Sequence, residues 1–454
     1  MGVLLPDIMA RGAPGDGARR FIWGASTSAA QIEGAASEDG RGPSIWDGFA
    51  AEPGRIADGS TPAVACDHYH RWQGDIALMR ELGIGAYRFS IAWPRVMPAG
   101  RGAVNMQGLA FYERLVDGLL AAGIQPMPCL YHWDLPLALH QAGGWLNRDA
   151  ADWFADYATA VVRRLGDRVP HWFMLNEPSV QAMFGYALGD HAPGLNGGAS
   201  AFLAVLHNQN RAQGTALRAL RAARSGLKLG TVLSLQPTLA DSDEPADRQA
   251  AVRWDAVWNR LALDGLMRGR IPDVLADPMK GIVRPGDLEQ VRFPIDLLGL
   301  NYYSRMTVRH QPGALFDVGW GRPRTDRITA MGWPVQPDGL YDILQELKQL
   351  YGNPPVIVTE NGAAYDDRLA SDGTVADAAR IAFLRDHVAE VMRARTDGCN
   401  VKGYMVWSLL DNFEWAAGYT RRFGLLYVDY PSQRRIPKQS FAWYRNIVRG
   451  RKAD

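Results

Sequence analysis

The stretch Val356-Ile357-Val358-Thr359-Glu360-Asn361-Gly362 combines an apolar strand with a carboxylate at its end. Its apolar and β-branched residues predict a buried strand, and Gly362 marks the turn that follows. Because a buried carboxylate is costly unless it is paired or used, its position needs an explanation. A second stretch, Trp172-Phe173-Met174-Leu175-Asn176-Glu177-Pro178, repeats the pattern before a strand-stopping proline. Two such distant glutamates can face one another in a parallel barrel, which gathers strand ends.

The rest of the chain alternates short apolar strands with longer amphipathic helices about eight times. Eight such repeats predict an α/β protein with a single (β/α)8 TIM barrel, whose active site lies at the C-terminal strand ends. We expect strands over 21–27, 86–93, 126–133, 171–177, 227–235, 295–304, 356–360 and 401–410. We expect helices over 69–82, 107–122, 149–165, 201–223, 246–267, 339–350, 376–394 and 440–448. An open doubly wound sheet is the alternative, but no G-x-G-x-x-G follows the first strand.

The barrel domain is expected to cover residues 21–450, after a disordered lead-in over residues 1–20. Two long loops, 32–67 and 310–338, are expected to shape the pocket on the catalytic face. The 49 Lys and Arg residues nearly balance the 48 Asp and Glu residues, so the charge favours neither a nucleic-acid nor a membrane partner. Three widely spaced cysteines and an N-terminus without a secretory leader predict a reduced, cytoplasmic protein without a structural zinc site.

Aromatic and amide residues at the strand ends favour a carbohydrate ligand. The chain has 15 Trp and 16 Tyr, and the apolar faces of sugars stack on such rings. Gln31 follows the first strand, and its amide can both donate to and accept from a hydroxyl. His132 ends the third strand, and alternation places Asn301 and Tyr303 on one side of the sixth, with Tyr302 on the other. After the eighth strand, Trp407, Glu414 and Trp415 resemble a sugar platform with a hydroxyl acceptor.

Five motifs resemble those of family 1 glycoside hydrolases of the bacterial β-glucosidase type, over nearly the whole chain. They are Gln31-Ile32-Glu33-Gly34, Tyr131-His132-Trp133-Asp134, Asn176-Glu177-Pro178, Thr359-Glu360-Asn361-Gly362 and Asn412-Phe413-Glu414-Trp415. The resemblance implies a retaining β-glucosidase that cleaves terminal β-D-glucosyl residues from small β-glucosides, such as cello-oligosaccharides or aryl glucosides. It implies no cofactor and no metal.

The same resemblance assigns roles to individual residues. It implies that Glu360 is the nucleophile and Glu177 the acid/base, with carboxyl groups roughly 5–5.5 Å apart in retaining enzymes. The residues implied to hold the glycone hydroxyls are Gln31, His132, Asn176, Glu414 and Trp415, with Trp407 as the floor. Arg88 and Tyr303 would orient Glu360, with Asn301 in a supporting position, and Trp333 and His191 would line the aglycone side. Ser179 departs from the pattern, because similar enzymes usually carry an aromatic residue there.

Three other functions are weighed against this one. A 6-phospho-β-glycosidase is the main alternative, but the Glu414 carboxylate would repel a 6-phosphate, and we expect Arg421 and Arg422 to be solvated. A non-catalytic sugar-binding barrel would be favoured by loss of either strand-end glutamate, and both are present. A metal-dependent barrel hydrolase would lose activity in EDTA. The natural aglycone, the preference among gluco-, galacto- and fuco-configured sugars, transglycosylation and the oligomeric state stay open.

Overall fold

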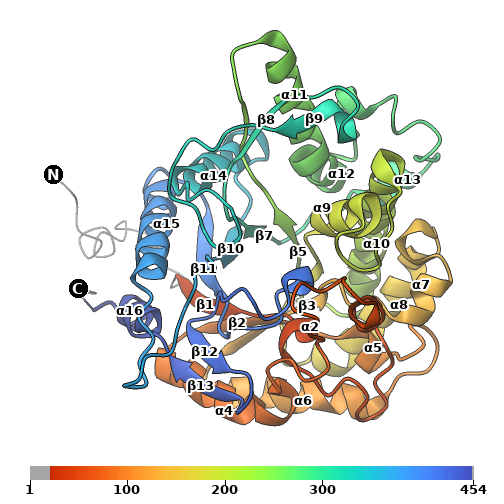
Figure 1. The fold of residues 1–454 in the computed structure, drawn as a ribbon. Helices are drawn as coiled ribbons and strands as arrows, with labels where there is room; N and C mark the ends of the chain where they lie inside the picture. Colours follow the sequence, from red (N-terminus) through yellow and green to blue (C-terminus); the bar gives the residue numbers. More distant parts are fainter. Residues whose placement is uncertain (1–20, 452–454) are drawn as a thin grey trace.

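A closed barrel of parallel strands organises residues 21–451, which are the residues that this computed structural model describes. Around the barrel the strands follow the order β1-β11-β10-β7-β5-β4-β3-β2, so strands consecutive in the repeats are neighbours (Figure 1). Their bounds are β1 Ile22–Ser26, β2 Ala86–Ser90, β3 Gln125–Tyr131, β4 His171–Asn176, β5 Lys228–Ser234, β7 Leu297–Asn301, β10 Val356–Asn361 and β11 Val401–Trp407. The predicted TIM barrel is confirmed.

An outer layer of helices covers the barrel (Figure 1). The long ones are α4 His68–Leu82, α6 Met106–Ala121, α8 Ala150–Leu165, α10 Gly198–Ala223, α14 Asp338–Leu350, α15 Ala378–Thr396 and α16 Gln439–Val448. These bounds agree with the predicted helices within about three residues. The helix expected over 246–267 differs, because a π-helical turn over Ala256–Arg260 separates α11 Pro245–Asp255 from α12 Leu261–Arg268.

The two long loops contain structure that the sequence did not predict. Segment 32–67 includes helix α3, Ile45–Ala51, whose N-terminus is closed by a capping box between Ser44 and Asp47. The region around 310–338 contributes to a three-stranded sheet made of β6 Thr238–Ala240, β8 Met306–His310 and β9 Val318–Trp320. A hairpin of β12 Leu426–Asp429 and β13 Arg434–Pro437 follows the last barrel strand. These elements are too short to show a clear hydrophobic period.

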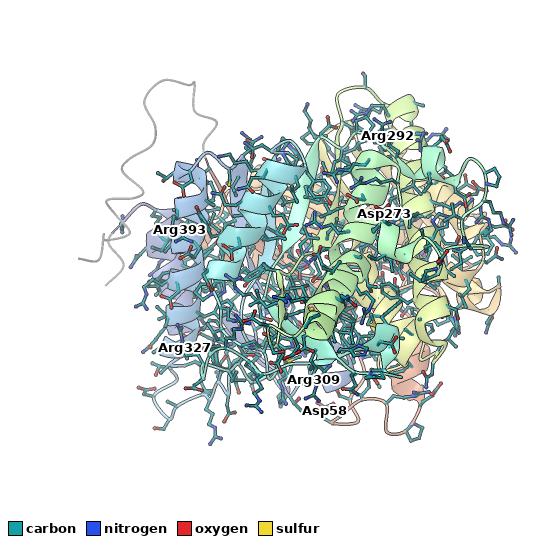
Figure 2. All side chains as sticks on the ribbon, turned by 90° about the horizontal axis from the view of Figure 1, so that it is seen from above. Asp58, Asp273, Arg292, Arg309, Arg327 and Arg393 are labelled. Carbon is teal, nitrogen blue, oxygen red and sulfur yellow. The ribbon has the colours of Figure 1, made fainter. Side chains whose placement is uncertain are left out.

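Buried side chains fill the barrel interior. The interior cluster consists of Ala86, Met127, Cys129, Phe173, Val232, Leu297, Ile357 and Met405. Asp58, Arg309 and Arg327, which lie in segments that follow barrel strands, are at one end of the molecule, and Arg292, which precedes β7, is at the other (Figure 2). Both strand-end glutamates lie at the C-terminal ends of their barrel strands.

The cysteines and the N-terminal segment remain to be placed in this fold. Cys66, Cys129 and Cys399 are buried free thiols. The expected disorder of residues 1–20 falls outside the described residues. In the described part of the chain, the helices are too short or too polar to cross a bilayer.

Candidate active site

Glu360 lies at the end of β10 with both carboxyl oxygens held by donors. Oε1 accepts a hydrogen bond from Arg88 Nη1 at 2.5 Å, and Oε2 accepts one from the Tyr303 hydroxyl at 2.7 Å. Arg88 is fully buried on β2, so its charge is little screened by solvent. Burial raises the pKa of Glu360, while Arg88 and Tyr303 act in the opposite direction. Arg88 and Tyr303 thus favour the ionised form of Glu360, although burial still leaves its pKa above the usual value.

Glu177 directly follows β4 and has a different environment. Its backbone adopts a left-handed conformation, with φ of 46°, before Pro178 begins the short helix α9, Pro178–Gln181. Such a conformation costs free energy for a residue other than glycine and is concentrated at functional sites. Burial, and then the charge of Glu360, raise the pKa of Glu177 to about 8. A proton shared between the two glutamates therefore resides on Glu177 near neutral pH.

Asn176 connects three of the predicted site residues in one buried network. Its Oδ1 accepts from Arg88 Nη2 at 2.6 Å and from Asn301 Nδ2 at 3.1 Å. Its Nδ2 donates to His132 Nε2 at 2.9 Å, which places the proton of the neutral imidazole on Nδ1. Burial lowers the pKa of His132, so the ring stays neutral. Within the described residues Nδ1 has no partner, and its N–H is available to a ligand.

The segment after β11 forms the opposite part of the site. Glu414 is fixed by Gln31, whose Nε2 donates to Asn412 Oδ1 at 3.1 Å, Phe413 O at 2.9 Å and Glu414 Oε2 at 3.4 Å. Burial, and then the charge of Glu360, raise the pKa of Glu414 to about 8. The sequence argument treated Glu414 as a carboxylate, but burial and the charge of Glu360 favour its protonated form at neutral pH.

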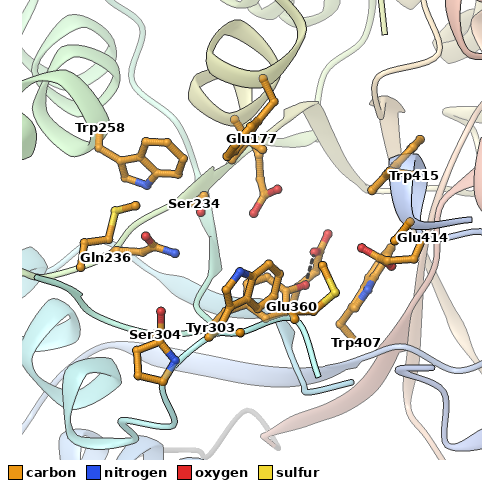
Figure 3. A pocket seen from close by; sticks show the side chains of 18 of the residues that line it. Glu177, Ser234, Gln236, Trp258, Tyr303, Ser304, Glu360, Trp407, Glu414 and Trp415 are labelled. Atoms are coloured by element: carbon orange, nitrogen blue, oxygen red, sulfur yellow. Dashed lines mark hydrogen bonds between the residues drawn. The ribbon is translucent and has the colours of Figure 1, made fainter. Parts of the chain in front are cut away.

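One cavity of about 620 Å³ joins these groups. Of the predicted site residues, the cavity is lined by His132, Glu177, His191, Tyr303, Trp333, Glu360, Trp407, Glu414 and Trp415. Figure 3 shows the two glutamates in the middle, with Trp407, Glu414 and Trp415 on one side and Gln236 and Trp258 on the other. The remaining predicted residues, Gln31, Arg88, Asn176 and Asn301, are buried behind the wall and act through the hydrogen bonds given above.

Aromatic rings shape both ends of this cavity. The His132 ring is stacked near Trp407, with centroids 5.7 Å apart, and near Trp415, at 5.8 Å. Trp333 lies 5.2 Å from the Tyr303 ring, while His191 packs against Phe184 at 5.2 Å. Burial lowers the pKa of His191 to about 4, so this imidazole is neutral.

Two expectations about this site need correction. Segment 310–338 lines the cavity, but none of the described residues 32–67 does, because Trp46 instead packs behind Trp415 at 4.6 Å. Ser179, the departure noted in the sequence, is buried and does not line the cavity, whereas the aromatic side chain of Phe184 does. Arg422 is not solvated, since its Nη1 donates to Asp411 Oδ2 at 2.7 Å.

Several lining residues were missed from the sequence: Phe184, Ser234, Gln236, Trp258, Met306, Trp320 and Met331. Ser234 and Gln236 could have been found from the sequence. Ser234 ends β5 and Gln236 follows it, just as Glu360 lies at the end of β10 and Glu177 follows β4. Trp258 and Trp320 carry no local signal. Trp258 belongs to the unpredicted π-helical turn, and Trp320 to the unpredicted strand β9.

Comparison with known proteins places the chain among enzymes of one family. The model of glycosyl hydrolase family 1 matches residues 17–453. Beta-glucosidase A of Thermotoga maritima is 44% identical, with 94% of this chain and 97% of that protein aligned. A bifunctional beta-D-glucosidase/beta-D-fucosidase of Bifidobacterium breve is 47% identical, with 94% and 97% aligned.

The same relation holds for a solved structure. The beta-glucosidase from Thermotoga maritima in complex with glucoimidazole superposes with a TM-score of 0.92 at 43% identity, and 95% of this chain and 98% of that one are covered. The family match spans the barrel and both strand-end glutamates. The chain therefore belongs to glycosyl hydrolase family 1, the family that its strand-end motifs resemble.

Proposed function

We propose that Glu360 is the nucleophile and Glu177 the acid/base of this enzyme. As a member of a retaining family, the chain is a β-glucosidase that hydrolyses terminal non-reducing β-D-glucosyl residues by double displacement. The observation that carries the assignment is the unequal environment of the two carboxyls. Glu360 is bound by a guanidinium and a phenol, whereas burial and the neighbouring charge raise the pKa of Glu177 to about 8.

In the first step the Glu360 carboxylate attacks the anomeric carbon while the glycosidic C–O bond breaks. Glu177 gives its proton to the departing oxygen, and a glycosyl ester forms on Glu360. Formation of the ester removes the negative charge that raised the pKa of Glu177. The deprotonated Glu177 then takes a proton from water, which attacks the same carbon, releases glucose and restores the Glu360 carboxylate.

The glucosyl unit occupies the end of the cavity near Trp407, Glu414 and Trp415 (Figure 3). Glu414 can donate its proton to one hydroxyl and accept from another, and the His132 Nδ1–H supplies a further donor. Trp407 offers an apolar surface for the C–H face of the ring. Gln31 and Asn176 keep these groups in place, and whether they also contact hydroxyls stays a prediction.

An unphosphorylated sugar fits this end better than a 6-phosphate. Arg305 is the basic side chain among the described lining residues, and it is paired with Asp338 at 2.7 Å and Asp342 at 2.6 Å. Arg422 is occupied by Asp411. A phosphate would thus find no uncommitted cation among these groups, and at higher pH it would meet the ionised Glu414.

The biological setting is part of the proposal. Cello-oligosaccharides or aryl β-glucosides are the proposed substrates, which would give the enzyme a role in cellulose degradation. The three buried free thiols support a reducing, cytoplasmic location. A nucleic-acid partner is not expected from the balanced charge.

Trapping of the covalent intermediate tests the assignment. A 2-deoxy-2-fluoro-β-glucoside with a dinitrophenolate leaving group should inactivate the enzyme, and peptide mapping should place the adduct on Glu360. Glu360→Ala should lose nearly all hydrolysis and still bind glucose analogues. EDTA should leave activity unchanged. An adduct on any other residue would overturn the assignment.

A further inference from the structure

The segment that carries Glu414 and Trp415 closes into a tight turn. The backbone N–H of Glu414 donates to Gly418 O at 2.7 Å, and the N–H of Gly418 donates to Trp415 O at 3.0 Å. Trp415 has a left-handed backbone, with φ of 53°, and Gly418 has φ of 61° and ψ of −135°. The conformation of Trp415 costs free energy and persists only where the surrounding contacts hold it. The turn therefore depends on contacts from outside itself to keep Glu414 and Trp415 in place.

The loop between α3 and α4 supplies such contacts from the solvent side. The N–H of Ala57 donates to Ala416 O at 2.8 Å. The Asp58 carboxylate accepts from the N–H of Tyr419 at 2.8 Å, and the Tyr419 hydroxyl donates to Thr61 O at 2.9 Å. Asp58 and Tyr419 are 361 positions apart in the sequence. Three hydrogen bonds thus fasten a loop near the start of the chain to the turn that follows β11.

Asp58 makes the central contact of this set. Its Oδ2 accepts from Tyr419, while Oδ1 accepts from the N–H of Ser60 at 3.0 Å and from its hydroxyl at 2.5 Å, which fixes the direction of the carboxylate. Burial raises the pKa of Asp58, but the hydrogen bonds from Ser60 and Tyr419 together leave it below its usual value, so Asp58 is ionised near neutral pH. The carboxylate also lies directly against Gly418, where a Cβ atom would overlap it.

The other contacts of the turn are buried. The Trp46 ring lies behind Trp415 at 4.6 Å, and the N–H of Phe413 donates to Gln31 O at 3.2 Å. Trp46, Phe413 and Gln31 are all buried, whereas Asp58 is exposed. Asp58 can therefore be replaced without opening the core, which makes its contact with the turn open to direct test.

We propose that Asp58 is a positioning residue for the glycone end of the cavity, acting through the turn that carries Glu414 and Trp415. Asp58 does not line the cavity, so it touches no substrate. The inference rests on the proposed function, which places the glucosyl unit beside these two side chains (Figure 3). Loss of the Asp58 contact weakens binding of the glucosyl unit and leaves the chemical steps at the two catalytic glutamates in place.

Replacement of Asp58 in the full-length enzyme tests this role. In Asp58→Ala, the KM for p-nitrophenyl β-glucoside and the inhibition constant of glucose should both rise about fivefold, while kcat stays within about twofold. The value of kcat/KM on cellobiose should fall by the same factor, because the two substrates share the glycone. Asp58→Asn keeps an acceptor for the N–H of Tyr419 and should retain most of the affinity. Glu52→Ala is the matched control, because it removes a carboxylate of the same loop that pairs only with Arg55 in the described contacts.

A double-mutant cycle separates positioning from a general loosening of the fold. Because Asp58 acts through the turn, Asp58→Ala should lower kcat/KM on p-nitrophenyl β-glucoside much less in a Glu414→Gln background than in the parent. Gly418→Ala should also cost less once Asp58→Ala has removed the carboxylate that the added methyl group overlaps. Thermal unfolding of each variant checks that it is folded.

Two results would contradict the positioning role. One is an unchanged inhibition constant of glucose in folded Asp58→Ala, and the other is an equal loss from Asp58→Ala in both backgrounds of the cycle with Glu414→Gln. Either result, with normal hydrolysis of p-nitrophenyl β-glucoside by the parent enzyme, would refute the role of Asp58 alone. Failure of the parent enzyme to hydrolyse that substrate would refute the proposed function.

Discussion

The acid/base role of Glu177 predicts a particular pH dependence. Burial, and then the charge of Glu360, raise the pKa of Glu177 from 4.5 to about 8. At pH 7, about 90% of the molecules then carry the proton that the leaving group needs, against about 0.3% for a carboxyl with a pKa of 4.5. The environment of Glu177 thus increases the active fraction about 300-fold at this pH. Activity should fall as the pH rises above about 8, when Glu177 loses the proton.

The perturbation is Glu177→Gln, which keeps the size of the side chain and removes the acid. For cellobiose, kcat/KM should fall roughly 10²–10⁴-fold, the usual contribution of general acid catalysis. Glycosylation by dinitrophenyl β-glucoside should fall far less, because a dinitrophenolate departs without a proton. Its pH profile in the variant should lack the basic limb near pH 8. In Glu177→Ala, added azide should restore turnover and give the β-glycosyl azide.

Two outcomes would refute this reasoning. The first is an equal loss on both leaving groups without azide rescue, because then Glu177 does not protonate the leaving group. The second concerns the coupling between the glutamates. A trapped 2-deoxy-2-fluoroglycosyl ester neutralises Glu360, so the pKa of Glu177, measured by carbon-13 NMR, should fall. An unchanged pKa would contradict the electrostatic argument.

Four further predictions follow from single contacts. Tyr303→Phe removes a donor to Glu360, so the acidic limb of kcat/KM should move to higher pH, as a pH series would show. Activity on p-nitrophenyl β-glucoside should greatly exceed that on its 6-phosphate, and the reverse order would favour a phosphoglycosidase. Lys438→Met removes the cation that Asp367 and Asp411 share, at 2.5 and 2.6 Å, but leaves each with an arginine partner. The free energy of unfolding should therefore fall in a denaturant titration, by less than the roughly 3–5 kcal/mol that an unpaired buried charge costs. Burial raises the pKa of Asp134 from 3.8 to about 7, so the stability linked to its proton is present below about pH 4 and is lost as the pH rises through 7. The free energy of unfolding of Asp134→Asn, relative to that of the parent, should therefore increase by up to about 4 kcal/mol by pH 8. Thermal unfolding measured across this pH range tests the difference.

Local sequence determined the repeat pattern and the positions of the chemistry. The residues from Val356 to Thr359, before Glu360, are all apolar or β-branched and predict a buried strand, and the apolar run from Trp172 to Leu175, before Asn176 and Glu177, does the same. Eight such runs between amphipathic helices leave few arrangements other than a barrel. The sequence also located Glu360 and Glu177 at strand ends, and a barrel brings strand ends to one mouth.

Tertiary structure alone decided which side chains contact one another and which protonation state each of them favours. Arg88 and Glu360 are 272 positions apart, and only closure of the barrel brings their side chains together. The neighbours Arg421 and Arg422 look alike in sequence, yet Arg422 is paired with Asp411 while Arg421 bonds only to Thr420 in the contacts of the described residues. Trp258 lies on a π-helical turn and Trp320 on a three-residue strand, and both elements are too short to show a periodic signal. Local patterns reflect local burial, whereas pKa values and ligand contacts depend on neighbours that the chain supplies from far away.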